Sequence, residues 1–152
     1  GKLADVAADV AIGIAEGLGV TGVLAVELFE TVDDRIPVNE LAMRPHNSGH
    51  WSIEGSTTSQ FEQHLRAVLD LPLGATGSVH PWAVMVNILG GPASGVLSDR
   101  YPAVFEDHPT VHVHNYGKAP RPGRKIGHVT VTGSDLDEVA YDARAAAAQL
   151  SD

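Results

Sequence analysis

The chain has 152 residues, of which 43% are hydrophobic, and its formal net charge is −9. This length fits one ordinary domain or two small ones, and the acidic balance argues against nucleic acid or an anionic membrane surface as the main partner. The absence of cysteine excludes disulfides and thiolate metal sites, in agreement with a cytoplasmic protein. We also find no apolar run of membrane-spanning length and no signal-peptide pattern.

In the first half of the chain, apolar residues at helical spacing predict an amphipathic helix from Leu3 to about Glu16. Residues 20–30 have the β-branched, apolar composition of a buried strand, and residues 35–43 predict a second strand that Pro45 ends. Residues 46–58 are polar and follow neither period, so we expect a functional loop there.

A capping box at residues 59–62 then opens a helix. Further along we expect a buried strand, a short helix, a strand, a strictly alternating half-exposed strand and a last helix opened by Ser134; their residues are 83–91, 101–107, 111–116, 127–133 and 134 onward. A composition shift at residues 71–81 suggests a boundary between domains 1–74 and 75–152. The fold class we predict is α+β, with a mostly antiparallel sheet flanked by helices.

Two glutamates come together if the first two strands form a hairpin. With the turn centred between Asp33 and Asp34, Glu27 faces Glu40 directly across the strands. Like charges in that position are destabilising, by roughly 3 kcal/mol at about 5 Å and an effective dielectric near 20.

Two arrangements relieve this repulsion: one carboxyl group is protonated, or a cation lies between the two. With Asn39 nearby the oxygen ligands suit Mg²⁺, which leaves positions for water and phosphate oxygens. The alternative is a slipped register, in which both glutamates reach solvent or pair with Arg35 and Arg44.

A basic segment interrupts the acidic chain, since no acidic residue lies between Asp107 and Asp135. Four of the ten basic residues occur there: Lys118, Arg121, Arg124 and Lys125. This clustering fits an anion site and fits equally a solvated loop that offsets acidic neighbours.

The segments "RPHNSGHW" (44–51), "SQFEQHLRA" (59–67) and "RPGRKIGH" (121–128) closely resemble the N5-carboxyaminoimidazole ribonucleotide synthetase family of ATP-grasp ligases. The likeness covers nearly the whole chain; one departure is Ala42-Met43-Arg44, where the family usually has Ala-Pro-Arg. The resemblance implies that residues 1–74 are the C-terminal part of an ATP-grasp domain and residues 75–152 the C-terminal subdomain. It also implies a C-terminal portion that lacks most of the ATP-binding lobe and is inactive alone.

In that family ATP phosphorylates bicarbonate to carboxyphosphate, and the exocyclic amine of 5-aminoimidazole ribonucleotide takes up the carboxyl group in purine biosynthesis. The resemblance implies ATP and Mg²⁺ as cofactors and a homodimer as the intact enzyme. It assigns roles residue by residue: Glu27 and Glu40 to Mg²⁺, Asn39 and Glu40 to ATP, Arg44, His46 and Lys118 to catalysis, and Asn47, Ser48, Lys118, Arg124, Arg121 and Lys125 to the substrate.

Other interpretations stay open from the residues alone. His46 is also compatible with a loop histidine that only bonds backbone, and the chain with a non-catalytic anion-binding or subunit-interaction module. A biotin-carboxylase-like enzyme is disfavoured because "RPHNSGHW" and "RPGRKIGH" occur together. A zinc pair at His46 and His50 is disfavoured because Gly49 argues for a loop, and we expect ordinary packing or surface roles for His112 and His114.

Overall fold

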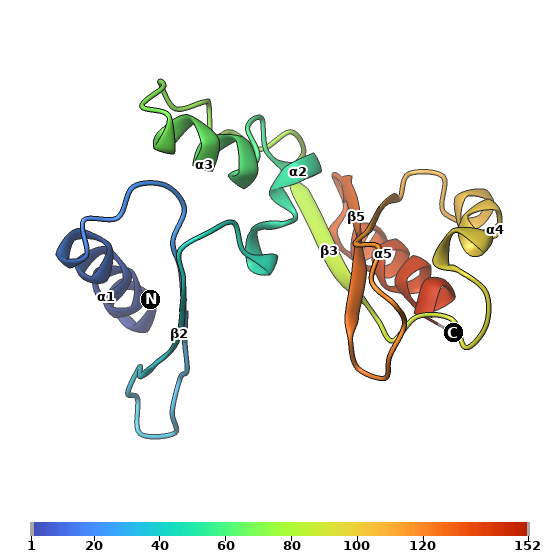
Figure 1. The fold of residues 1–152 in the computed structure, drawn as a ribbon, viewed down its shortest axis with the longest axis horizontal. Helices are drawn as coiled ribbons and strands as arrows, with labels where there is room; N and C mark the ends of the chain where they lie inside the picture. Colours follow the sequence, from blue (N-terminus) through green and yellow to red (C-terminus); the bar gives the residue numbers. More distant parts are fainter. Residues whose placement is uncertain (1, 152) are drawn as a thin grey trace. The chain divides into compact units, whose positions relative to one another are not determined.

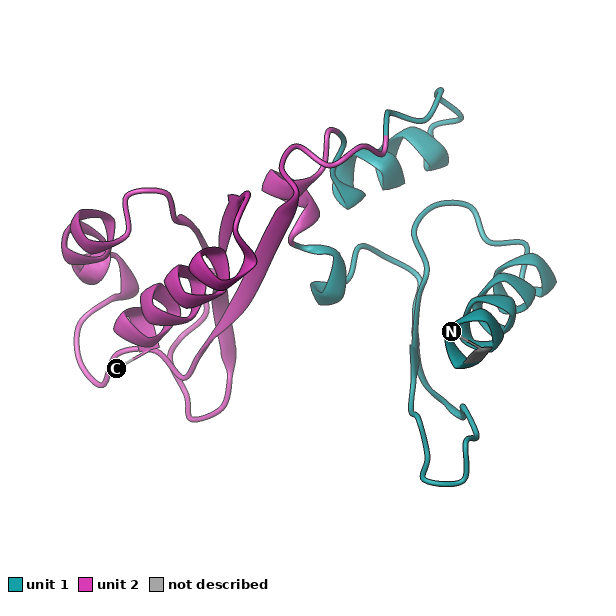
Figure 2. Ribbon diagram, turned by 180° about the vertical axis from the view of Figure 1, so that it is seen from behind, with its two compact units in different colours: residues 1–50, 58–75 teal, residues 51–57, 76–152 magenta. Residues whose placement is uncertain are grey.

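The computed structural model describes residues 2–151 and divides them into two compact units, coloured separately in Figure 2. Unit 1 runs to residue 50 and includes residues 58–75, and unit 2 comprises residues 51–57 and those from 76 onward. Helices and antiparallel sheets make up both, which confirms the α+β class. Within residues 2–151, no helix combines the length and the apolar character needed to cross a membrane.

Unit 1 is built on a helix and a hairpin (Figure 1). α1 (Lys2–Gly17) confirms the predicted amphipathic helix, and β1 (Ala25–Leu28) pairs antiparallel with β2 (Val38–Ala42). In the turn, a side-chain hydrogen bond with Thr31 and a second from Arg35 hold the pKa of Asp33 below its usual value. The turn is therefore fixed by its own polar side chains.

The predicted loop at residues 46–58 contains two short helices, so its lack of period was misleading. They are the 3₁₀ helix η1 (Asn47–Gly49) and α2 (Ser52–Gly55). Elements this short give no repeat for a periodicity argument to detect. α3 (Gln60–Val68) starts as the capping pattern predicts, with the Ser59 hydroxyl accepting from the Glu62 amide.

Unit 2 is a three-stranded antiparallel sheet in the order β3-β5-β4, with α5 packed across β3 and β5 (Figure 1). The strands are β3 (Trp82–Leu89), β4 (His112–Asn115) and β5 (Lys125–Gly133). η2 (Leu97–Arg100) and α4 (Tyr101–Asp107) lie between β3 and β4 in the chain, and α5 (Leu136–Ser151) follows β5.

The prediction of a half-exposed strand at residues 127–133 is wrong. Residues 126–131 of β5 are all buried, because β3 and β4 flank the strand and both of its faces are covered. The Gly133 face meets Val139 of α5, and the opposite face carries His128, which stacks on His114. Alternating polar residues in this strand therefore face the protein interior.

The last helix is capped one residue later than predicted. One oxygen of the Asp135 carboxylate, Oδ1, accepts from the amides of both Asp137 and Glu138, a cap that the Ser134 prediction missed. The small side chains of α5 let the helix approach the sheet closely. The resulting core consists of Ile88, Leu97, Val104, Val111, Ile126, Val129, Val131, Val139, Ala143, Ala146, Ala147 and Leu150.

Close packing at Gly127 gives the first testable prediction. A Cβ at this position would collide with the backbone carbonyl oxygen of His114 on β4. We expect Gly127→Ala to lower the free energy of unfolding of unit 2 by about 1–3 kcal/mol, measured by chemical denaturation. The control is Gly77→Ala, where the nearest atom lies 3.6 Å from the new Cβ. Equal stabilities of the two variants would contradict this packing.

Candidate functional site

Glu27 and Glu40 are direct cross-strand partners in the hairpin of unit 1, as predicted. The predicted turn centre is wrong, because a register shift after Glu27 pairs Leu28 with Val38, one residue away from the predicted partner. Residues opposite each other in an antiparallel pair share a face, so both carboxylates project from the same side. The Glu27 side chain is 45% exposed, and water therefore screens part of the repulsion between the two groups.

Glu27 is also the centre of a small polar cluster. Its Oε2 accepts a hydrogen bond from the Asn39 amide at 3.2 Å, and its Oε1 lies 3.2 Å from Nε2 of His46. His46 is the better buried partner, with a side chain that is 13% exposed. Both oxygens of Glu27 therefore have a polar neighbour besides the second glutamate.

The hydrogen bonds of His46 define its tautomer. The backbone N–H of Ser48 can only donate, and it lies 3.3 Å from Nδ1, so Nδ1 accepts. The neutral ring then carries its hydrogen on Nε2, the nitrogen that lies 3.2 Å from Oε1 of Glu27. His46 therefore contacts a carboxylate as well as backbone, which goes beyond the purely backbone-bonded alternative.

The side chain of Gln60, on α3, forms hydrogen bonds with the loop that contains His46. Gln60 Oε1 accepts from the His46 amide at 2.9 Å, and Gln60 Nε2 donates to the His46 carbonyl at 2.8 Å and contacts Nδ1 of His50 at 2.8 Å. The neighbouring Arg44 donates to the Pro45 carbonyl at 3.1 Å and is exposed. Asn47 and Ser48 belong to η1 in the same loop.

We expect Gln60→Ala to loosen this loop, because one side chain makes three of its hydrogen bonds. The amide of His46 should exchange with solvent about tenfold faster, measured by hydrogen exchange on the chain. Gln63→Ala is the matched control, since Gln63 makes similar bonds to the backbone of Gly74 from the same helix. If both variants change the His46 amide equally, Gln60 does not hold the loop.

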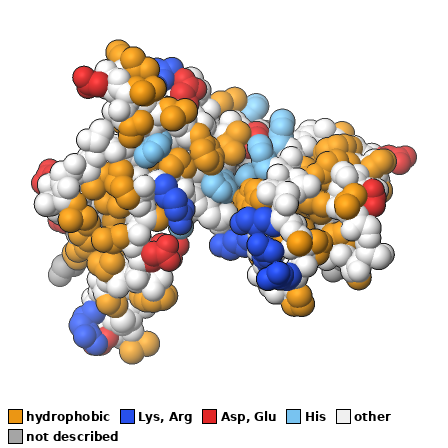
Figure 3. All heavy atoms as spheres, in the orientation of Figure 1, with side chains coloured by type: hydrophobic (Ala, Val, Ile, Leu, Met, Phe, Trp, Pro, Cys, Tyr) orange, Lys and Arg blue, Asp and Glu red, His pale blue; other side chains and the backbone are white. Residues whose placement is uncertain are grey.

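The basic segment forms an ordered loop at one end of the unit 2 sheet. The Gly90 amide donates to the Arg124 carbonyl at 2.8 Å, and the Arg121 amide donates to the Gly90 carbonyl at 3.1 Å. Lys118, Arg121 and Lys125 are exposed and Arg124 is half-buried. Figure 3 shows Lys and Arg side chains gathered on one face of unit 2, beside histidine side chains.

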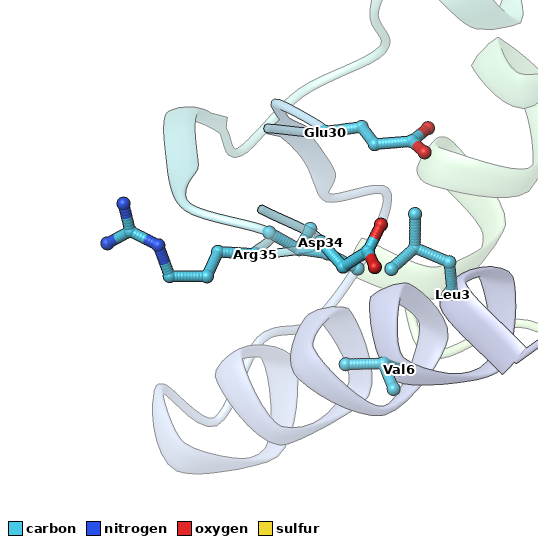
Figure 4. Close-up of a pocket in the computed structure, with 6 residues that line it drawn as sticks. Leu3, Val6, Glu30, Asp34 and Arg35 are labelled. Carbon is cyan, nitrogen blue, oxygen red and sulfur yellow. The ribbon is translucent and has the colours of Figure 1, made fainter. Parts of the chain in front are cut away.

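One cavity lies beside the basic loop, and another lies in unit 1. A groove of about 280 Å³ runs between the glycine pair at 90–91 and residues 120–122, so the basic loop borders an accessible hollow. A pocket of about 620 Å³ lies elsewhere, between α1 and the hairpin of unit 1. Figure 4 shows Leu3 and Val6 of α1 beside it, with Arg35 pointing away. No predicted site residue lines this second pocket.

Sequence reasoning missed a polar network in unit 2. Glu54, His114, His128 and Tyr116 are connected by hydrogen bonds and a ring stack. The expectation of an ordinary role for His114 considered only the strand that contains it. The sequence also predicted a strand containing His128, and a pairing of these two strands could have indicated that the histidines meet. Among the described residues, no group of three or more His, Cys, Asp and Glu side chains is arranged to hold a metal ion.

Two family models match the chain. The ATP-grasp domain matches residues 1–61, and the phosphoribosylaminoimidazole carboxylase C-terminal domain matches residues 83–142. The N5-carboxyaminoimidazole ribonucleotide synthase of Mycobacterium tuberculosis (strain ATCC 25618 / H37Rv) is 55% identical over 151 residues, which is 98% of this chain and 35% of that protein. The chain thus spans about a third of the length of the curated relatives it matches.

Solved structures agree with the sequence matches. The N5-carboxyaminoimidazole ribonucleotide synthetase of Thermus thermophilus superposes with a TM-score of 0.78 at 40% identity, covering 99% of this chain and 39% of that one. The synthase of Aspergillus clavatus, solved in complex with ADP and 5-aminoimidazole ribonucleotide, gives a TM-score of 0.68 at 40% identity, covering 84% of this chain and 34% of that one.

Proposed function

The chain belongs to the N5-carboxyaminoimidazole ribonucleotide synthase family of ATP-grasp ligases, and we propose that it contributes part of the active site for the ATP-dependent carboxylation of 5-aminoimidazole ribonucleotide. In this reaction bicarbonate takes the terminal phosphoryl group of ATP, giving ADP and carboxyphosphate. The exocyclic amine nitrogen then bonds to the carboxyl carbon, the carbon–oxygen bond to phosphate breaks, and one proton leaves the amine.

Glu27 and Glu40 are the residues that would hold Mg²⁺, with Asn39 and Glu40 beside the nucleotide. The donor set fits, because two hard carboxylates on one face leave positions for phosphate oxygens. Each oxygen of Glu27 keeps a second lone pair beyond its contact with Asn39 or His46. When bound, the ion neutralises charge on the phosphoryl group that is transferred.

His46 is the proton carrier in this proposal. A proton that arrives at Nδ1, where it replaces the hydrogen bond accepted from the Ser48 amide, produces an imidazolium ring, and the Glu27 carboxylate, 3.2 Å from Nε2, stabilises that cation. The amine of the substrate loses its proton as the nitrogen–carbon bond forms. Arg44, which is exposed next to this loop, is the residue that would bind a bicarbonate or carboxyphosphate anion through two parallel hydrogen bonds.

The basic loop binds the substrate phosphate. Lys118 and Arg124 are the main ligands, and Arg121 and Lys125 add positive charge at the same edge of the sheet. Backbone hydrogen bonds between Gly90 and the loop fix its shape before binding, which lowers the entropy lost when the phosphate is captured. The groove beside Arg121 leaves space for the ligand.

The observation that supports the proposal most is the Glu27–Glu40 register with His46 against Glu27, in a chain that is 55% identical to a named synthase. Bicarbonate as co-substrate, Mg²⁺ as metal, a homodimeric enzyme and a cytoplasmic location complete the proposal.

The test uses a chimera in which this chain replaces the matching part of the Mycobacterium tuberculosis protein. We expect ADP release that depends on 5-aminoimidazole ribonucleotide. In this chimera Glu40→Gln should lower kcat by about 100-fold or more, because one charged ligand of the metal is lost while the shape is kept. ADP binding, measured separately, establishes that the nucleotide lobe is intact. Normal turnover by Glu40→Gln would refute the metal assignment.

Lys118→Ala tests the phosphate assignment in the same chimera. We expect KM for the ribonucleotide to rise about tenfold or more with a smaller change in kcat, because the lost contact serves binding in the ground state as well. Arg144→Ala is the matched control, since Arg144 is an exposed cation on α5 of the same unit. A rise in KM of the same size in both variants would mean that only net charge matters.

A further inference from the structure

A stacked pair of histidines joins β4 to β5 in unit 2. His114 and His128 are cross-strand partners, and their ring centroids lie 4.4 Å apart with 13° between the planes. The proposed function gives neither ring a role. Because the two rings are in contact, the charge and tautomer of one imidazole set the electrostatic field at the other.

A glutamate from α2 holds the outer ring. Nε2 of His114 lies 2.7 Å from Oε1 of Glu54, whose side chain is 12% exposed. An ionised carboxylate only accepts, so His114 carries a hydrogen on Nε2 and donates it. The other oxygen of Glu54 is buried without a hydrogen-bond partner in the described part of the chain. The bond from His114 therefore offsets the desolvation of this carboxylate.

The second ring of the stack, that of His128, connects the pair to the basic loop through Tyr116. His128 is 1% exposed, and its Nδ1 lies 2.7 Å from the hydroxyl of Tyr116. The ring of Tyr116 in turn has Nζ of Lys118 at 5.2 Å from its centroid. A phenol that donates its hydrogen to an imidazole becomes more electron-rich, which strengthens its attraction for a cation over the ring.

We infer that Glu54, His114 and His128 are positioning residues that act through Tyr116 to set where Lys118 rests. The contacts are continuous from α2 to the basic loop: carboxylate to imidazole, imidazole stacked on imidazole, imidazole to phenol, and phenol ring to ammonium. The functional meaning of this placement rests on the proposed role of Lys118 in binding the substrate phosphate.

Nuclear magnetic resonance on the 152-residue chain tests the inference. Glu54→Gln keeps the side-chain shape and removes the charge, and we expect it to shift the ring ¹⁵N resonances of His128, a residue to which Glu54 is linked through His114. Glu106→Gln, an exposed carboxylate on α4, is the control and should leave those resonances unchanged. Unmoved His128 nitrogens in folded Glu54→Gln would overturn the inference.

Tyr116→Phe is the second variant, and it decides the matter even if Glu54→Gln does not fold. It keeps the ring and removes the hydroxyl that His128 holds. We expect the ε-methylene protons of Lys118, shifted upfield by the ring, to move toward the values of an exposed lysine. If they stay in place, the ring is oriented without His128 and the inference fails.

Titration with 5-aminoimidazole ribonucleotide separates this inference from the proposed function. Tyr116→Phe should bind about threefold to tenfold more weakly, and Lys118→Ala more weakly still. If Lys118→Ala binds as well as the unchanged chain while the Lys118 resonances still follow Tyr116, the phosphate assignment falls and the positioning role stands. If Lys118→Ala loses binding while Tyr116→Phe leaves both affinity and resonances unchanged, the positioning role falls.

Discussion

The central constraint on the proposed site is a pair of carboxylates that lie opposite each other in the antiparallel hairpin of unit 1. Glu27 and Glu40 repel each other, and the ladder between β1 and β2 prevents them from separating. Asn39 donates a hydrogen bond to one oxygen of Glu27, and Nε2 of His46 lies 3.2 Å from the other. Glu40 is exposed beside this partner, which suits the cation-binding role that we propose for it.

The groups that we propose to be reactive lie on loops, and residues in or next to regular elements hold the backbone of those loops. The side chain of Gln60 on α3 makes two hydrogen bonds to the backbone of His46. Gly90, which follows β3, makes two backbone hydrogen bonds to the basic loop. Neither tie involves the groups proposed to contact substrate. The backbone beneath the cationic and imidazole side chains is thus already ordered, as preorganised binding requires.

β5, the central strand of unit 2, contains polar residues that are unusual in a buried strand. His128 and Thr130 are 1% and 0% exposed, on the face opposite the one that α5 covers. Burying an imidazole costs free energy unless it is hydrogen-bonded, and the bond to Tyr116 together with the stack on His114 lowers that cost. An apolar residue at position 128 would pack without this cost. The presence of His128 is therefore better explained by its hydrogen bond to Tyr116, next to the basic loop, than by the packing of the core.

The sequence alone determined most of the local elements and the pairing of Glu27 with Glu40. Helical spacing, the Ser59 cap and the strand compositions depend on neighbours in the chain. The register shift between Glu27 and the turn was decided by the structure, because one extra residue in a strand leaves the strand pattern unchanged. The tertiary structure decided three further things: that β5 is central and buried, that Glu27 contacts His46, and that Glu54 contacts His114 sixty residues away. These outcomes depend on which strands and helices meet, and residues distant in sequence leave no periodic signal of that meeting in either segment.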